Sequence, residues 1–397
     1  MKKKSIENIA VKGKRVFVRV DFNVPMNDAH EISDDTRIKT SLPTLRYLVD
    51  NGAKIVCASH LGRPNGKKKL DLTMEPVARR LAKLLGRDVQ FPGEIIGKEV
   101  DVAKSRLKEG DILLLQNLRF HAGETGNDPD FARELAKDID IYVNDAFGAS
   151  HRAHASIEAI TRMVPISCAG FLLKKEIDFL SMALENHKKN YVVILGGAKV
   201  SDKLPLIQNL IKKAKKILIG GAMAYSFLKA KGFDVGRSEV EDDQLPLCKD
   251  IMETADKMKI KFLLPVDHIA AHAIEPEVTI RMIRKGETIP DEMMGLDIGF
   301  ETIELYTQEL KGADLIVWNG PLGVFEIDTF SAGTIEIARA VASGSATTIV
   351  GGGDTIAAIN KAGIADQITH LSTGGGAALE FLSGLKLPGI EALPNEE

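Results

Sequence analysis

Two ammonium groups, those of Lys199 and Lys203, flank a glycine turn near the middle of the chain, in the sequence LGGAKVSDK. The apolar run at 192–195 predicts a strand that is buried on both faces and ends at this turn. Ser201 and Asp202 commonly begin helices, so we expect a helix to follow. Free N–H groups and a helix dipole then predict a phosphate site, whereas a structural turn with two solvated lysines is the competing interpretation.

A second glycine turn, at 351–353, also follows an apolar run and precedes a candidate helix. Asp354 comes directly after it and could hold Mg²⁺, a cation that proteins bind through few carboxylates together with nucleotide phosphates. Asp354 could equally cap the helix, and its spacing leaves both interpretations open. Glu326, shortly after the turn at 319–321, could accept hydrogen bonds from a ribose. A further glycine turn lies at 373–376.

Arginine and histidine side chains of the first half lie in expected turns or just after expected strands: Arg37, His60, Arg63, Arg119, His151, Arg152 and His154. The planar guanidinium group matches phosphate and carboxylate oxygens. A single arginine is more often part of a surface ion pair, but the repeated placement after strands predicts a small, highly anionic ligand. No further residue has metal-ligand spacing around His151 and His154, which we interpret as structural or anion-facing.

The elements that position these residues are short apolar strands alternating with amphipathic helices, a pattern typical of α/β proteins with parallel sheets. In such sheets, ligands bind at the carboxyl ends of the strands, where the polar and glycine residues lie in this sequence. We expect strands at 16–20, 55–58, 112–115, 141–143, 192–195, 217–219, 262–264, 315–318 and 348–350.

Two Rossmann-like lobes suit a chain of 397 residues, because single hydrophobic cores rarely grow beyond ~250–300 residues. The candidate anion-binding Arg and His residues fall within 1–170, and the glycine turns named above fall within 189–376. We therefore expect the first lobe to bind the small anion and the second to bind a nucleotide with Mg²⁺. An amphipathic pattern at 171–188 predicts a connector helix between the lobes.

The composition is that of a soluble globular protein, with 44% hydrophobic and 27% charged residues. A formal net charge of −3 gives no support for bulk binding to nucleic acid or to anionic membranes. The three cysteines are widely spaced, which suits buried packing residues in a reducing compartment. The basic N-terminus has no apolar segment after it, and no run reaches the ~18 apolar residues of a membrane span, so we expect a cytoplasmic protein.

A lobe for a polyanion and a lobe for a nucleotide together predict phosphoryl transfer, in which catalysis is mostly positioning and charge stabilisation. Neither GxxxxGK[ST] nor GxGxxG occurs in the sequence. The missing GxGxxG counts against the main rival, a nicotinamide dehydrogenase of similar architecture. A nucleotide-sensing protein without activity is the other alternative, because a fold does not fix a function.

Longer motifs carry a more specific likeness. They are RVDFNVP at 19–25, SHLGRP at 59–64, NLRFHAGE at 117–124, NDAFGASHRAHAS at 144–156, LGGAKVSDK at 195–203, WNGPLGVFE at 318–326, GGGDT at 351–355 and STGGGA at 372–377. With these motifs in this order, the chain resembles the phosphoglycerate kinase family over its whole length. It departs from the family pattern at Gln116, Ala222, Phe300 and Ala378.

The resemblance implies reversible phosphoryl transfer from 1,3-bisphosphoglycerate to ADP, giving 3-phosphoglycerate and ATP, in glycolysis and gluconeogenesis. Transfer would be direct and in line after the lobes close. The resemblance also implies a monomer, and a C-terminal tail, 377–397, that returns to the first lobe.

The resemblance further assigns roles to individual residues. It implies that the acid is bound by Asp21, Asn23, Arg37, His60, Arg63, Arg119 and Arg152. It implies that nucleotide is bound by Gly197, Lys199, Lys203, Gly221, Asn319, Pro321, Glu326, Gly351, Gly352, Gly353, Asp354 and Thr355, with Asp354 on Mg²⁺. The groups that would stabilise the phosphoryl group in flight are Arg37, Lys199 and the backbone N–H groups of Gly352, Gly353 and Gly375.

Overall fold

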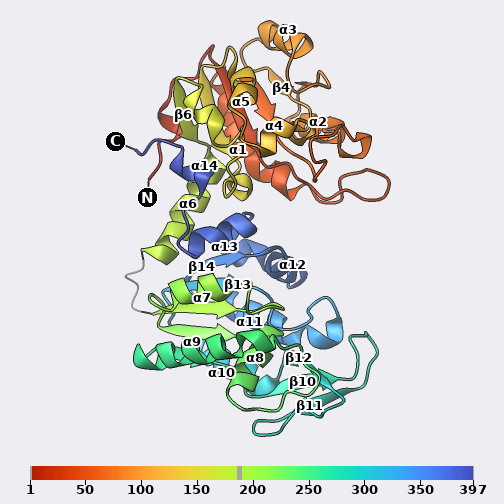
Figure 1. Ribbon diagram of the computed structural model, residues 1–397, viewed down its shortest axis with the longest axis vertical. Coiled ribbons are helices and arrows are strands. Elements are labelled where there is room, and N and C mark those ends of the chain that lie inside the picture. The colour runs from red at the N-terminus through yellow and green to blue at the C-terminus, as the bar shows by residue number, and fades with distance from the viewer. Residues whose placement is uncertain (1, 186–189, 397) are drawn as a thin grey trace. The chain divides into compact units, whose positions relative to one another are not determined.

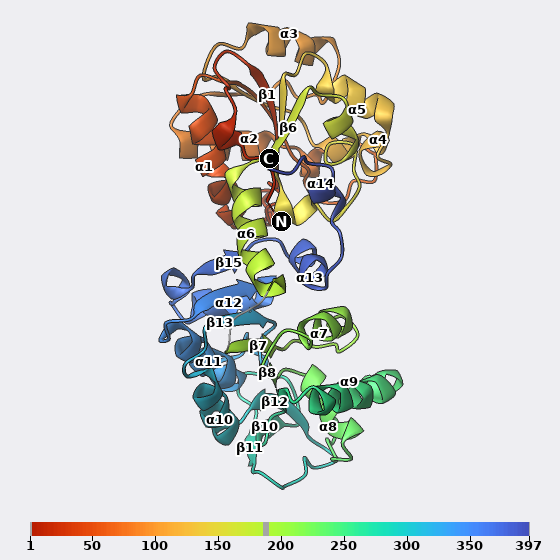
Figure 2. The same cartoon turned by 90° about the vertical axis from the view of Figure 1, so that its left-hand side faces the viewer.

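The chain folds into two compact units in a computed structural model that describes residues 2–185 and 190–396. The first unit contains Met1–Asp178 and Lys386–Glu397, and the second contains Phe179–Leu385. Each unit is built on its own six-stranded parallel sheet (Figures 1 and 2), which confirms the predicted fold class. Among the described residues, no helix is both long and apolar enough to cross a membrane.

The first unit has the strand order β3-β4-β2-β1-β5-β6. Its strands are β1 (Arg15–Val20), β2 (Lys54–Ala58), β3 (Val89–Gln90), β4 (Ile112–Leu114), β5 (Ile141–Asp145) and β6 (Ile166–Ala169). Its helices are α1 (Thr36–Asp50), α2 (Glu75–Leu85), α3 (Lys98–Arg106), α4 (Ala122–Thr125), α5 (Pro129–Ala136) and α14 (Pro388–Glu391). Short 3₁₀ helices occupy Ile6–Asn8, Leu70–Leu72, Leu118–Phe120, Phe147–Ala149 and Ala159–Arg162. Figure 2 shows α1 and α2 on one side of the sheet and α4 and α5 on the other.

The second unit has the strand order β15-β14-β13-β7-β8-β9 and a separate antiparallel sheet in the order β11-β10-β12. Its strands are β7 (Tyr191–Leu195), β8 (Lys216–Ile219), β9 (Lys261–Leu263), β10 (His268–Ala271), β11 (Ile280–Ile283), β12 (Met294–Ile298), β13 (Leu315–Asn319), β14 (Thr347–Gly351) and β15 (His370–Ser372). Its helices are α7 (Leu204–Leu210), α8 (Met223–Ala230), α9 (Leu245–Lys257), α10 (Phe300–Leu310), α11 (Ala332–Ala342), α12 (Gly353–Lys361) and α13 (Gly376–Leu382). Its 3₁₀ helices are Asp242–Gln244, Asp328–Phe330 and Ala365–Gln367.

Every predicted strand is present, with its ends within about two residues of the expected ones. All three cysteines are buried, as expected. The sequence reasoning missed β3, β6, β15 and the whole antiparallel sheet. β3 has only two residues, and three of the four residues of β11 are exposed, so neither offers a hydrophobic period to detect.

The predicted helix start at Ser201 and Asp202 is wrong. Helix α7 begins at Leu204 with Lys203 as its N-cap residue, and no side chain caps it. Pro205 at the start of α7 explains the shift, because proline fits the first turn of a helix, where its missing N–H is not needed. Ser201 instead makes a contact with Glu241 that is described below.

The expected connector corresponds to helix α6 (Phe171–Leu184), within which one unit ends and the next begins. Residues 186–188 of that prediction lie outside the described residues. The tail is expected to belong to the first lobe from residue 377 onward. In the structure α13 belongs to the second unit, and only Lys386–Glu397 belongs to the first. The amide of Asn144 donates to the carbonyl of Gly389 at 3.0 Å, which fixes this last segment to the end of β5.

The turns that follow β7 and β13 cross each other at glycine residues, so that backbone lies directly against backbone. Gly196 N donates to Asn319 O at 3.0 Å, and Gly197 N donates to Pro321 O at 2.8 Å. A Cβ atom on Gly320 would lie 2.1 Å from the carbonyl oxygen of Gly196, and the φ angle of Gly320 is +96°. Only glycine is compatible with this crossing, which brings two of the expected nucleotide loops together.

We expect Gly320→Ala to destabilise the second unit by about 1–3 kcal/mol more than Gly232→Ala does. Gly232 is a matched control because its φ angle is +91° and a Cβ atom there meets nothing within 4 Å. Both variants carry the backbone strain, and only Gly320→Ala adds the collision. Denaturant unfolding measures the difference, and equal losses in the two variants would contradict the crossing.

Candidate active site

A buried ion pair lies behind the carboxyl edge of the first sheet. Arg19, in β1, and Glu124, in α4, are both fully buried, with the guanidinium Nη2 and the carboxylate Oε1 3.9 Å apart. Ser156 joins them, because its Oγ accepts from Arg19 Nε at 2.8 Å and donates to Glu124 Oε1 at 2.6 Å. Ser156 N also donates to Glu124 Oε2 at 3.0 Å. The carboxylate and these hydrogen bonds compensate a cation that the core would otherwise exclude.

The same arginine fixes the tautomer of His60, which follows β2. Arg19 Nη2 lies 3.1 Å from His60 Nδ1. A guanidinium group only donates, so Nδ1 accepts and the imidazole proton is on Nε2. Burial, followed by the charges of Arg19 and Arg119, lowers the pKa of His60 well below its usual range. His60 is therefore a neutral hydrogen-bond donor at neutral pH.

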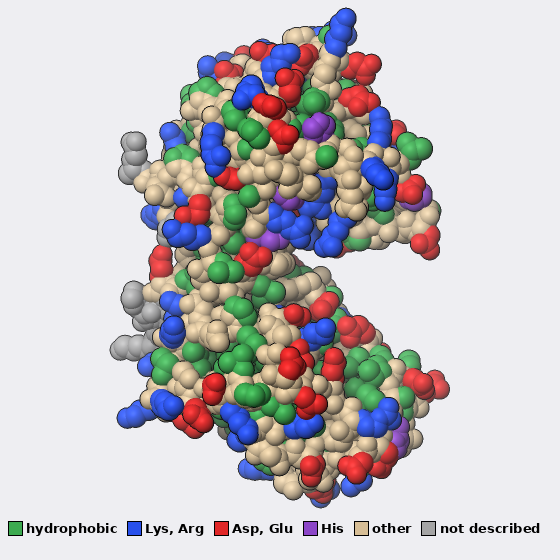
Figure 3. Space-filling view, viewed as in Figure 1, with side chains coloured by type: hydrophobic (Ala, Val, Ile, Leu, Met, Phe, Trp, Pro, Cys, Tyr) green, Lys and Arg blue, Asp and Glu red, His purple; other side chains and the backbone are tan. Residues whose placement is uncertain are grey.

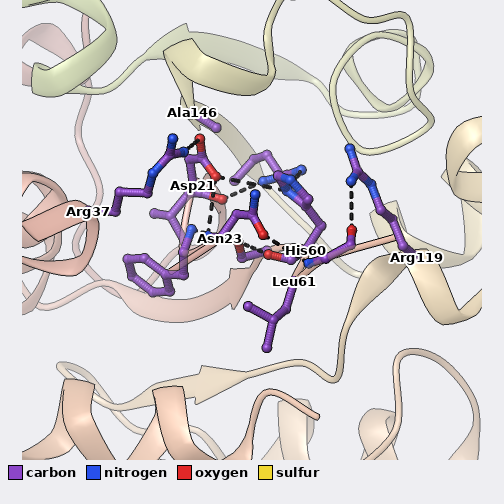
Figure 4. Close-up of polar contacts among 12 residues, drawn as sticks. Asp21, Asn23, Arg37, His60, Leu61, Arg119 and Ala146 are labelled. Carbon is purple, nitrogen blue, oxygen red and sulfur yellow. Dashed lines mark hydrogen bonds and ion pairs between the residues drawn. The ribbon is translucent and has the colours of Figure 1, made fainter. Parts of the chain in front are cut away.

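Asp21 and Asn23 lie in the turn after β1 (Figure 4). Asp21 Oδ2 accepts a hydrogen bond from Arg37 Nη1, so Arg37, in the first turn of α1, is held at the same edge. Asn23 Oδ1 accepts from Gly62 N at 2.8 Å, which ties the turn after β1 to the turn after β2. Arg119 donates to Gly62 O at 2.8 Å. The structure thus brings most of the expected acid-binding residues together.

Positive charge is concentrated at this edge. Burial, and then the guanidinium groups of Arg19 and Arg152, lowers the pKa of Arg119 to about 10, so Arg119 stays charged at neutral pH. Arg152 is exposed and donates to His151 Nε2 at 3.1 Å. Figure 3 shows Lys, Arg and His side chains gathered on one face of the first unit. Such crowding of cations is favourable only when an anion binds among them.

Arg63 and His154 also belong to the Arg and His residues expected at this edge. Arg63 lies beside Gly62, and its side chain is exposed. His154 is buried with its Nδ1 3.8 Å from Glu124 Oε1, and burial together with the nearby arginines lowers its pKa to about 3. His154 is therefore neutral at neutral pH.

In the second unit, several expected nucleotide residues line one pocket. The pocket has a volume of about 240 Å³, and the residues from the expected set that line it are Gly197, Gly221, Pro321, Glu326 and Asp354. The other walls include Tyr225, in α8, and Met294 and Leu296, in β12. These apolar and aromatic walls were not foreseen from the sequence. Apolar and aromatic walls combined with glycine backbone and a few carboxylates are the composition typical of small-molecule sites.

Lys203 is bound to the residue that ends β13. Its Nζ donates to Asn319 Oδ1, and Asn319 is buried. Thr355 Oγ1 accepts from Gly320 N at 2.7 Å, so the turn after β13 is fastened to α12. Burial lowers the pKa of Lys203, although Asp202 and Asp354 act in the opposite direction. Lys199, by contrast, is exposed on its turn.

The capping interpretation of Asp354 is excluded, because Gly352 is the N-cap residue of α12 and Asp354 lies inside the first turn with an exposed side chain. Gly351 ends β14, Gly353 begins α12, and Gly375 is the N-cap residue of α13. No group of three or more His, Cys, Asp or Glu side chains within residues 2–185 and 190–396 could hold a metal ion by itself. A single exposed carboxylate beside a helix N-terminus fits Mg²⁺ that arrives with nucleotide phosphates.

Gln116, one of the departures from the family pattern, organises the turn that carries Arg119. Gln116 Oε1 accepts from Met74 N and from Asn117 N, each at 2.8 Å. Gln116 Nε2 donates to Thr73 Oγ1 at 2.9 Å. Both backbone contacts need only an acceptor oxygen, so the amide can serve where an acidic residue is common.

A two-unit α/β protein with a cationic edge in one unit and a separate glycine-lined pocket in the other has the architecture of a phosphotransferase. The comparisons name the family. A family model described as phosphoglycerate kinase matches residues 6–385. Phosphoglycerate kinase of Koribacter versatilis is 52% identical and that of Thermosipho africanus 54%, with at least 99% of each chain covered. The structure of phosphoglycerate kinase from Coxiella burnetii gives a TM-score of 0.90 at 38% identity and 98% coverage of both chains. The chain belongs to the phosphoglycerate kinase family.

We expect Glu124→Gln to lower the free energy of unfolding by about 3 kcal/mol, because it leaves the Arg19 charge buried without its counter-ion. Glu134→Gln, at an exposed position in α5, is the control and should change stability by less than about 0.5 kcal/mol. Denaturant unfolding compares the variants. If Glu124→Gln is as stable as the control, the ion pair does not hold this edge together.

Proposed function

We propose that this chain catalyses reversible phosphoryl transfer from 1,3-bisphosphoglycerate to ADP, giving 3-phosphoglycerate and ATP. The observation that carries the proposal is the presence of two different sites on a chain of this family: a cationic edge in one unit and a glycine-lined pocket in the other. Phosphoryl transfer requires both kinds of site, because each reactant brings its own phosphate groups.

In this proposal the cationic edge binds the acid. Arg119, Arg152 and Arg63 supply guanidinium groups for phosphate oxygens. His60 donates from Nε2, since its Nδ1 already accepts from Arg19. Asp21 and Asn23 accept from or orient the substrate hydroxyl, and Arg37 lies beside them for the reacting carboxyl end. The role of His60 follows from its occupied Nδ1, and the other roles follow from the family resemblance.

The pocket of the second unit holds the nucleotide in this proposal. The base lies against the apolar wall that includes Tyr225 and Met294. Glu326 accepts hydrogen bonds from the ribose, and Lys203 and the first turn of α12 bind the phosphates. Asp354 would hold Mg²⁺, which neutralises phosphate charge when it is bound.

The chemistry needs no general base. The acceptor in the direction of ATP consumption is a carboxylate, which is ionised at neutral pH because carboxyl groups have reference pKa values of ~3.5–4. What the protein must supply is charge stabilisation along a direct, in-line path. We assign this role to Arg37 and Lys199, together with the backbone N–H groups of Gly352, Gly353 and Gly375.

We further propose that the protein works as a cytoplasmic monomer in glycolysis and gluconeogenesis, without nucleic acid or membrane partners. The net charge of −3 supports the last two points. The first unit is the acid lobe in this proposal, and the second is the nucleotide lobe.

A coupled assay with 3-phosphoglycerate and Mg-ATP tests the function, and Lys199→Ala tests the role of its ammonium group. We expect an active wild-type protein and a kcat about 10²–10⁴ lower in Lys199→Ala, with a smaller change in nucleotide KM. Lys212→Ala removes an exposed lysine of the same unit and should leave kcat unchanged. An inactive wild-type protein would overturn the function, and a normal kcat in Lys199→Ala would overturn its role.

Asp354→Asn tests the metal assignment separately. The substitution keeps the shape of the side chain and removes the charge that Mg²⁺ requires, so calorimetry should show about tenfold or greater loss of Mg-ADP affinity. Affinity for metal-free ADP and for 3-phosphoglycerate should stay the same. An unchanged Mg-ADP affinity would show that Asp354 does not hold the metal.

A further inference from the structure

The glycine turn that carries Lys199 is hydrogen-bonded to the carboxylate of Glu241, which lies outside the LGGAKVSDK motif. Glu241 Oε1 accepts from Ser201 Oγ at 2.6 Å, and Glu241 Oε2 accepts from Ser201 N at 3.0 Å. The two oxygens of one carboxylate thus satisfy both donors of one residue. Ser201 lies between Lys199 and Lys203, so this grip acts on the centre of the segment that presents both ammonium groups.

Glu241 is itself anchored. Its backbone N–H donates to Ser226 Oγ at 3.0 Å, and Ser226 is buried in α8. Glu239, two residues earlier, lines the nucleotide pocket. The segment that carries Glu241 therefore connects α8, the pocket wall and the glycine turn.

The other contacts of the turn act at its two ends. Gly197 is bonded to the turn after β13, through its N–H to Pro321 O at 2.8 Å. Lys203 is bonded to Asn319 through its Nζ. Between these ends, Ala198 and Lys199 face solvent, whereas Val200 is buried. The contact at Ser201 therefore acts beside the buried Val200 to limit the motion of the turn around Lys199.

We infer that Glu241 is a positioning residue for the phosphate-binding turn: its carboxylate clamps Ser201 and so fixes Lys199 and Lys203 for the nucleotide phosphates. The inference rests on the proposed nucleotide role of this turn. It deepens that role by adding a residue that does not itself touch the ligand.

The ionisation of Glu241 agrees with the clamp. Burial raises the pKa of Glu241, but the hydrogen bonds from Ser201 and from the Val200 N–H outweigh it, and the pKa lies below its ordinary value. The neighbouring Lys229–Asp242 ion pair is 2.9 Å long and lies on the surface, where such pairs contribute little. Asp242 therefore offers a matched control one position away.

Glu241→Ala should lower kcat/KM for the nucleotide about tenfold or more, because the hydrogen bonds that the carboxylate accepts from Ser201 and from the Val200 N–H are lost. The dissociation constant of 3-phosphoglycerate should not change, since the acid edge belongs to the other unit. Glu241→Gln should recover most of the loss, because its Oε1 can still accept from Ser201 N and its Nε2 can donate to Ser201 Oγ. Asp242→Ala should behave as the wild type.

Hydrogen exchange supplies a readout that needs no activity. Amides of 198–203 should exchange faster in Glu241→Ala than in Asp242→Ala, with the strands of the second sheet unaffected. Unchanged exchange in this turn, or equal loss of acid and nucleotide affinity in Glu241→Ala, would overturn the clamp. If the wild type lacks transferase activity, the proposed function fails, and the exchange measurement still decides whether the clamp exists.

Discussion

The buried ion pair between Arg19 and Glu124 is the interaction from which the anion site of the first unit is built. Burying a guanidinium group is unfavourable unless a carboxylate and hydrogen bonds compensate it, and here Ser156 completes the set. Because Arg19 is fixed, His60 is fixed as a neutral imidazole with its proton on Nε2. Burial and the charges of Arg19 and Arg152 outweigh the carboxylates of Glu124 and Asp21 at Arg119 and lower its pKa to about 10, so an anion that binds there would compensate its charge.

The second unit has glycine turns and lysines where the first has guanidinium groups. In the proposed function, this unit meets the phosphates of a nucleotide with backbone and two lysines rather than with guanidinium groups. The crossing at Gly196 and Gly320 excludes side chains and holds the turns after β7 and β13 against each other. Thr355 and Glu241 then fasten the turns from behind. Each unit thus holds its expected binding groups in place with buried or half-buried polar partners.

The sequence was sufficient to predict the two parallel sheets and the loops that bear the sites, because strand periodicity and glycine turns are local signals. It could not locate Glu124 or Glu241, whose partners are brought near only by folding; Ser201 and Glu241 are 40 residues apart. One signal was available: Arg19 interrupts the apolar strand RVFVRV and so requires a buried counter-charge. The start of α7 and the alternative of an Asp354 cap depended on backbone angles, which spacing does not determine.

The central claim is that the phosphoryl group passes directly between the nucleotide and the carboxylate, with the protein supplying only positioning and charge. The stereochemistry at the transferred phosphorus tests this most directly. With ATP made chiral at the γ-phosphorus by oxygen isotopes and 3-phosphoglycerate as acceptor, a single in-line displacement must invert the configuration. We expect inversion of the configuration at the transferred phosphorus. Retention would show two displacements through a phosphorylated side chain and would contradict it.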